Sequence, residues 1–189
     1  DYFKPSRPRI ISQKNKSILF PARLIKEKGL QELISACDLL WEEGYSFQLN
    51  LAGSLDYENN SSFTKKEISA YKSSRNISFL GHAENMKELY RDSDIVVLPS
   101  WREGLCNSLI EAATMECPII TTNVPGCKDV IDHGVNGIIV PVRNIVSLKL
   151  AIQFLLLNTE LSLEFGRNAR KKVIRLSLIH ISEPTRPSI

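Results

Sequence analysis

Short apolar runs alternate with longer amphipathic segments along most of this chain. The apolar runs predict six β-strands, and apolar residues that recur every three or four positions between them predict helices. The run Ile95-Val96-Val97-Leu98 is apolar throughout, which is typical of a strand in a parallel sheet covered by helices on both faces. The predicted strands are residues 17–21, 46–51, 76–80, 94–98, 118–121 and 137–140. The predicted helices are residues 29–43, 62–71, 86–92, 107–116, 145–158 and 160–172.

Strands that alternate with helices predict an α/β fold, here a doubly wound, Rossmann-like, six-stranded parallel sheet. Such sheets bind ligands at the carboxyl ends of their strands, near the point where the strand order reverses. Arg23 and Lys28 follow the first predicted strand, Gly53 follows the second and Glu103 follows the fourth. We therefore expect these residues, which are distant in sequence, to meet in one crevice.

The turn after the fourth predicted strand opens a helix and carries the richest candidate chemistry. Gly104 allows a ligand to approach the backbone closely, and the amides and dipole of a helix start suit a diphosphate. A thiol at such a position could have a lowered pKa, but we expect Cys106 to contribute its backbone amide and no thiol chemistry. The candidate diphosphate-binding residues here are Gly104, Leu105, Cys106 and Asn107.

Two carboxylates bracket this helix start, Glu103 in the turn and Glu111 eight residues later. We expect Glu103 to accept hydrogen bonds from a hexose, and Glu111, about 12 Å further along a helix, to reach the diol of a ribose. The alternative is the solvated surface position that is usual for glutamate. Glu111 lies between Ile110 and Ala112 in a mostly apolar helix, where an unpaired charge is costly, so it needs a partner or a ligand.

Arg23 and Lys28 are candidates for binding the diphosphate of a sugar nucleotide. They lie five residues apart in a loop that enters a helix, so both cations can face one ligand, whereas Lys26 is expected to be solvated. Negative charge grows on the leaving phosphate when a glycosidic bond breaks, and fixed cations stabilise that transition state. Gly53 is expected either to permit close backbone approach or to be a simple turn residue.

Several segments together resemble the retaining, GT-B-type glycosyltransferases, and most closely the large family numbered four, also called glycosyl transferases group 1. The resemblance covers about residues 1–173, although Gly53 lies in a departure from the family's usual Gly-x-Gly-Pro form. It implies the C-terminal, donor-binding half of a GT-B fold, with catalytic roles for Arg23, Lys28 and Glu103. The segments that carry it are residues 20–29, 79–82, 99–112, 121–126 and 134–137.

The resemblance also implies what the full-length enzyme does. It would transfer a hexose from a nucleoside diphosphate sugar, expected to be UDP-linked, to a glycan or lipid-linked acceptor in bacterial surface-polysaccharide synthesis. The acceptor would be bound through an N-terminal domain absent from this sequence. We therefore expect this chain alone to bind the donor without turning it over. The expected localisation is cytoplasmic, with peripheral attachment to the inner face of the membrane left open.

Two other functions remain open. A UDP-sugar epimerase can share the architecture, although the spacing of Glu103 and Glu111 argues against it. A non-catalytic nucleotide-binding or scaffold module could use the same sheet. A dehydrogenase-like version of that module is disfavoured, because no Gly-x-Gly-x-x-Gly follows the first predicted strand.

Composition agrees with one globular enzyme domain of 189 residues, of which 43% are hydrophobic. A net charge of +3 is too small to indicate nucleic acid as a partner. The four cysteines and three histidines form no metal-ligand pattern, so no metal or cofactor is predicted. The apolar run at 148–157 is much shorter than the roughly 20 residues of a membrane helix.

The sequence also predicts the domain limits. Residues 1–16 contain two prolines, Pro5 and Pro8, and a polar stretch, and are interpreted as an interdomain linker. Residues 17–175 form the nucleotide-sugar-binding domain. The helical pattern stops after Val173, and residues 176–189 are interpreted as a tail outside the fold.

Overall fold

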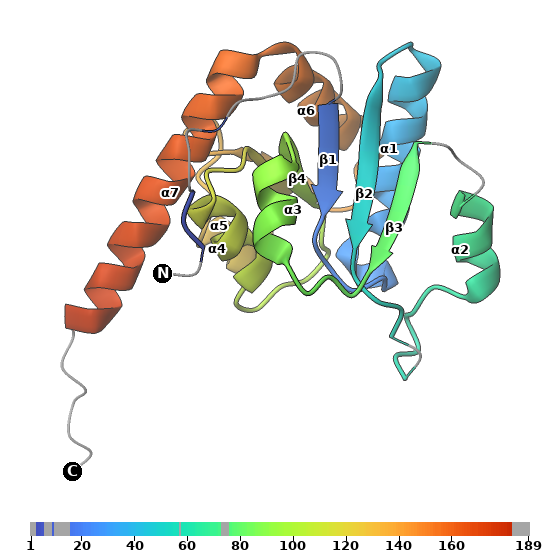
Figure 1. The fold of residues 1–189 in the computed structure, drawn as a ribbon, viewed down its shortest axis with the longest axis horizontal. Helices are drawn as coiled ribbons and strands as arrows, with labels where there is room; N and C mark the ends of the chain where they lie inside the picture. The colour runs from blue at the N-terminus through green and yellow to red at the C-terminus, as the bar shows by residue number, and fades with distance from the viewer. Residues whose placement is uncertain (1–2, 6–8, 10–15, 57, 73–75, 183–189) are drawn as a thin grey trace.

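The computed structural model describes residues 3–5, 9, 16–56, 58–72 and 76–182. In this part of the chain six parallel strands form one sheet flanked by helices (Figure 1). Their order across the sheet is β3-β2-β1-β4-β5-β6. The predicted doubly wound parallel sheet is therefore confirmed. The strands are β1 (Lys16–Phe20), β2 (Phe47–Ala52), β3 (Ile77–Gly81), β4 (Ile95–Leu98), β5 (Ile119–Thr122) and β6 (Ile138–Val140).

The six predicted helices are present, and two short ones join them. A 3-10 turn, η1, and the single-turn helix α5 were not predicted, because one turn is too short to show a periodic pattern. α2 begins later than predicted because Thr64 and Glu67 cap it, each side chain bonding to the other's backbone N–H. The helices are η1 (Lys26–Lys28), α1 (Leu30–Glu42), α2 (Lys65–Lys72), α3 (Met86–Asp92), α4 (Asn107–Thr114), α5 (Pro125–Lys128), α6 (Ile145–Leu157) and α7 (Thr159–Ser182).

The strand order determines which face of the sheet each helix covers. β1 leads through α1 to β2, and β4 leads through α4 to β5 in the opposite direction across the sheet. Because such crossovers are right-handed, α1 and α4 cover opposite faces. α6 packs against α1, and α7 packs against α4 (Figure 1). The two C-terminal helices thus complete one face each.

The central strands are the most deeply buried part of the domain. Ile18, Leu19 and Phe20 of β1 are fully buried, and every residue of β4 is buried. Helices on both faces remove these strands from water, which accounts for their uniformly apolar sequences. The loops at the carboxyl ends of β1 and β4 therefore extend from a rigid base.

Gly29 joins η1 to α1 and fixes this junction against the end of β4. Its φ of 75° lies in the left-handed region. A Cβ at this position would lie 2.1 Å from the carbonyl oxygen of Pro99. The backbone N–H of Trp101 also donates a hydrogen bond to the carbonyl oxygen of Glu27, at 2.8 Å. These contacts bring the segment after β1 beside the turn after β4.

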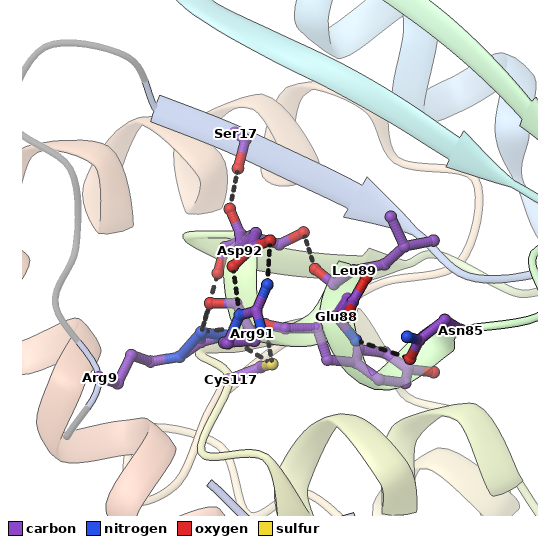
Figure 2. A network of polar contacts seen from close by, with 10 residues as sticks. Arg9, Ser17, Asn85, Glu88, Leu89, Arg91, Asp92 and Cys117 are labelled. Atoms are coloured by element: carbon purple, nitrogen blue, oxygen red, sulfur yellow. Dashed lines mark hydrogen bonds and ion pairs between the residues drawn. The ribbon is translucent and has the colours of Figure 1, made fainter. Parts of the chain in front are cut away.

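Arg9, within the predicted linker, is bound to the domain (Figure 2). Its guanidinium donates hydrogen bonds of 3.0 Å to the carbonyl oxygens of Tyr90, in α3, and Glu116, beyond α4. The last carbonyl groups of a helix lack intrahelical donors, so a cation placed there satisfies them. Phe3 packs edge-on against the Tyr90 ring, with centroids 6.0 Å apart. Most of the predicted linker lies outside the described residues, but Phe3 and Arg9 contact the domain.

The last helix is longer than predicted. α7 continues to Ser182, so the expectation that the helix ends near Val173 was wrong. Val173 is buried, and residues 174–177, the next four of the helix, are exposed. Backbone hydrogen bonds alone extend a helix that has already formed. The assignment of residues 176–189 to a tail outside the fold stays a prediction, and residues 183–189 lie outside the described part.

Candidate functional site

The predicted site residues gather around the carboxyl ends of β1 and β4. These neighbouring strands flank the point where the strand order reverses. Arg23 and Lys28 lie on the segment after β1, and Glu103 lies on the segment after β4. Gly53 follows β2, which is the next strand outward. The topology therefore places them where open parallel sheets bind ligands.

Lys28 and Glu103 are in direct contact. The Nζ atom of Lys28 lies 2.7 Å from Oε1 of Glu103, and the two side chains are only 19% and 8% exposed. The same Oε1 atom accepts a hydrogen bond of 2.6 Å from the hydroxyl of Ser100, which is fully buried. The Thr122 hydroxyl in β5 donates in turn to the Ser100 carbonyl oxygen. Lys28 and Ser100 thus hold the Glu103 carboxylate directly, and Thr122 holds Ser100.

Arg23 forms a more open ion pair. Its Nη1 atom lies 2.5 Å from Oδ2 of Asp56, and the side chains are 58% and 24% exposed. Asp56 belongs to the polar loop after β2. The Asp56 pair leaves Arg23 largely solvated, so the guanidinium can bind another anion at little cost.

Glycines bring the loops of the site into close backbone contact. A Cβ at Gly53 would lie 1.8 Å from the carbonyl oxygen of Ala22, so Gly53 permits the approach of the chain's own backbone. A Cβ at Gly126, in α5, would lie 1.5 Å from the carbonyl oxygen of Gly104. At Gly104 itself a Cβ would meet no atom within 4 Å. Space for a ligand is therefore open at Gly104 and filled by protein at Gly53 and Gly126.

The N-terminus of α4 presents its first turn without a side-chain cap. Cys106 is the N-cap residue, and its side chain makes no capping hydrogen bond. A hydrogen bond with Cys127, together with burial, raises the pKa of the Cys106 thiol. Leu105 is 75% exposed, and Asn107 is also exposed. This geometry favours a backbone role for Cys106, and the uncapped helix start suits an anion.

Glu111 lies on α4 in a half-buried position. Its Oε2 atom accepts a hydrogen bond of 3.1 Å from the hydroxyl of Tyr90. Burial raises the pKa of the Glu111 carboxyl, and the hydrogen bond from Tyr90 opposes that rise. The sequence indicated that Glu111 needs a partner or a ligand, and the structure supplies Tyr90 as a partner.

Three residues that the sequence did not single out contact the predicted site. Ser100 bonds to Glu103, Asp56 to Arg23, and Tyr90 to Glu111. Ser100 lies within the motif that includes Glu103, so it left a local signal. A buried tyrosine usually finds a partner for its hydroxyl, but Tyr90 is the one buried residue of α3, and only the structure shows its burial. Asp56 left none beyond its place in a polar loop.

Among the described residues, no three histidine, cysteine or acidic side chains gather closely enough to hold a metal ion. Within the same limits, no single helix combines the length and apolar composition needed to cross a membrane. Only α6 together with residues Thr159–Ser177, a pair bent by 104°, meets those two criteria.

Comparison with known proteins gives one consistent family. Residues 4–172 match the family model described as glycosyl transferases group 1. The chain is 32% identical over 154 residues to the capsular polysaccharide biosynthesis glycosyltransferase CapM of Staphylococcus aureus. The matched residues make up 82% of this chain and 40% of CapM. The chain spans less than half the length of the curated relatives it matches.

Solved structures show the same fold. The C-terminal domain of the group 1 glycosyl transferase LpcC from Francisella tularensis matches with a TM-score of 0.78 at 22% identity, over 92% of this chain and 95% of that one. HepE from Anabaena, in complex with UDP-glucose, matches with a TM-score of 0.73 at 20% identity, over 86% of this chain and 44% of that one. At these identities the likeness concerns the fold, which is that of a C-terminal GT-B domain.

Proposed function

Because the chain belongs to the group 1 glycosyl transferase family, we propose that it is the donor-binding domain of a retaining enzyme that transfers a hexose from a nucleoside diphosphate sugar. The observation that carries this proposal is the convergence of cations, carboxylates and an uncapped helix start at the carboxyl ends of β1 and β4. A sugar nucleotide needs these three kinds of group, for its diphosphate and for the hydroxyls at its two ends.

In this proposal the diphosphate lies against the N-terminus of α4. Lys28 and Arg23 supply positive charge, and the amides around Gly104 to Asn107 supply hydrogen bonds. When the bond from the hexose to the diphosphate breaks, negative charge increases on the leaving group. Cations that are already in position stabilise that charge more in the transition state than in the bound donor. The proposed chemistry of Arg23 and Lys28 is therefore electrostatic.

The two carboxylates take the two ends of the donor. Glu103 is held beside Lys28 and is proposed to accept hydrogen bonds from the hexose. Glu111, one to two helical turns further along α4, is proposed to bind the ribose diol. Neither role requires the carboxylate to act as a nucleophile or acid.

UDP is the proposed nucleotide, supported by the fold shared with HepE, which was solved with UDP-glucose. Surface-polysaccharide synthesis is the proposed pathway class, supported by the relation to CapM. A glycan or lipid-linked acceptor would bind through a part of the full-length enzyme outside this chain. The proposed location is the cytoplasm, with peripheral attachment to the inner face of the membrane left open. A UDP-sugar epimerase and a non-catalytic nucleotide-binding module are the alternatives.

Calorimetric titration of this chain with UDP, GDP and ADP, without metal and then with magnesium, tests the proposal. Titrations of the Lys28→Ala and Glu111→Ala variants accompany it. We expect UDP to bind without metal, and each substitution to weaken binding by about 1–3 kcal/mol, the range for a charge-assisted hydrogen bond.

Two outcomes would contradict the proposal. Folded wild-type protein that binds none of the three nucleotides would remove its basis. Unchanged affinity in both variants would assign binding to another site and favour the scaffold alternative. A product assay on the full-length enzyme, which distinguishes a transferred sugar from an epimerised one, separates the transferase from the epimerase.

A further inference from the structure

We propose that Tyr90 is a positioning residue for the nucleotide's ribose, because its buried hydroxyl orients the Glu111 carboxylate toward the diol. This inference rests on the proposed function and adds a residue to the same site. Tyr90 lies on α3, whereas the predicted site residues lie after β1, β2 and β4 and on α4.

The hydroxyl of Tyr90 is placed between two acceptors on α4. It lies 3.1 Å from Oε2 of Glu111 and 3.1 Å from the carbonyl oxygen of Ser108. A phenol has a single proton to donate, and an ionised carboxylate accepts it more strongly than a peptide carbonyl does. With one carboxylate oxygen bound to Tyr90, the freedom of the Glu111 carboxylate is restricted before any ligand arrives.

The other parts of Tyr90 are also held. The side chain is fully buried. Its backbone carbonyl accepts a hydrogen bond of 3.0 Å from Arg9, and its ring contacts Phe3 edge-on, at 6.0 Å between centroids. These contacts restrict movement of the Tyr90 hydroxyl away from Glu111. A partner that is fixed in this way reduces the freedom that a ligand-binding carboxylate would lose on binding.

The hydrogen bond between Tyr90 and Glu111 also influences the protonation state of both groups. Burial raises the pKa of Glu111, which disfavours its charged form, and the Tyr90 hydrogen bond lowers that pKa again. Burial and the charge of Glu111 both raise the pKa of Tyr90, so the phenol keeps its proton and remains a donor. Tyr90 thus favours the ionised carboxylate, which is the stronger acceptor for ribose hydroxyls.

The test compares the affinities for UDP and 2′,3′-dideoxy-UDP, which lacks the diol, in calorimetric titrations of this chain. We expect the wild-type protein to prefer UDP by about tenfold, Glu111→Ala to lose that preference, and Tyr90→Phe to reduce it to about threefold. Tyr45→Phe is the matched control, since the Tyr45 hydroxyl pairs with Gln153 at a distance of 2.7 Å. It should lose some stability and keep the tenfold preference. A loss of stability alone lowers the yield of folded protein and leaves the ratio unchanged.

The outcomes separate this inference from the proposed function. A preference that is lost in Glu111→Ala but unchanged in Tyr90→Phe overturns the role of Tyr90 and leaves the donor site standing. Wild-type protein that binds UDP without any preference over the dideoxy analogue overturns both ribose assignments, and absence of nucleotide binding overturns the proposed function itself. If Tyr90→Phe does not fold, a site-specific fluorotyrosine at position 90 keeps the volume and makes the hydroxyl a stronger donor. It should increase the preference, and an unchanged preference would overturn the inference.

Discussion

The Nζ atom of Lys28 lies 2.7 Å from Oε1 of Glu103, although the residues are 75 positions apart. Both side chains are largely removed from water, at 19% and 8% exposure. Each charge therefore stabilises the other in the absence of a ligand. We propose that Lys28 binds the diphosphate and Glu103 binds the hexose. A bound donor would therefore contact two charged groups that already pair with each other.

The energetic coupling of this pair can be measured by a double-mutant cycle with Lys28→Met and Glu103→Gln. We expect each single substitution to lower the free energy of unfolding by about 1–3 kcal/mol, because it leaves the partner poorly satisfied. The double variant should lose less than the sum of the two. Urea unfolding monitored by circular dichroism provides the values. Additive losses would show that the contact contributes no coupling.

Gly104, in the turn after β4, and Gly126, in α5, should respond differently to alanine. Gly126→Ala places a Cβ 1.5 Å from the Gly104 carbonyl oxygen, so backbone must move, and we expect a clear loss of stability. Gly104→Ala meets no protein atom within 4 Å, so stability should change by less than about 0.5 kcal/mol. UDP binding should nevertheless weaken in Gly104→Ala, because the methyl group occupies space left for the diphosphate. Thermal unfolding and calorimetry on both variants provide the comparison, and full UDP affinity in Gly104→Ala would exclude close ligand contact there.

Asp56 should compete with the donor for Arg23. Since the Arg23–Asp56 pair is exposed, Asp56→Asn is expected to change the free energy of unfolding by less than about 0.5 kcal/mol. The freed guanidinium should then bind UDP about two- to fivefold more tightly, the range for an exposed pair. Arg23→Ala should weaken UDP binding, and adding Asp56→Asn to it should have no further effect. Tighter binding in that double variant would show that Asp56 acts independently of Arg23.

The raised pKa of Glu111 predicts a pH-dependent stability difference. An acid whose pKa is higher in the folded state binds its proton more tightly when folded, so stability rises as the pH falls through that raised pKa. At neutral pH the wild-type protein contains a disfavoured charge that Glu111→Gln lacks. The variant should therefore be more stable at neutral pH, and the difference should shrink as the pH falls toward the ordinary value for glutamate. Urea midpoints of both proteins across this range provide the measurement, and a difference independent of pH would contradict the assignment.

The sequence determined the strands, the main helices and their order. Each strand begins and ends within one residue of its predicted position, because alternation between uniformly apolar runs and helical periodicity is a local property of the chain. The same patterns place the candidate cations after β1 and the candidate carboxylates in and after the turn that follows β4. Short helices such as α5 and the full length of α7 did not follow from these patterns. One turn shows no period, and α7 continues through residues 174–177, which are exposed, so its apolar pattern stops before the helix does.

Only the tertiary structure decided which side chains meet. Lys28 pairs with Glu103, Arg23 with Asp56, and Tyr90 with Glu111, each through segments that the sheet brings together. Such pairings depend on crossover geometry and on the loops between elements, and no local pattern encodes them. Gly53 shows the same limit, since its sequence allowed a close approach but only the fold showed that the backbone of Ala22 fills the space.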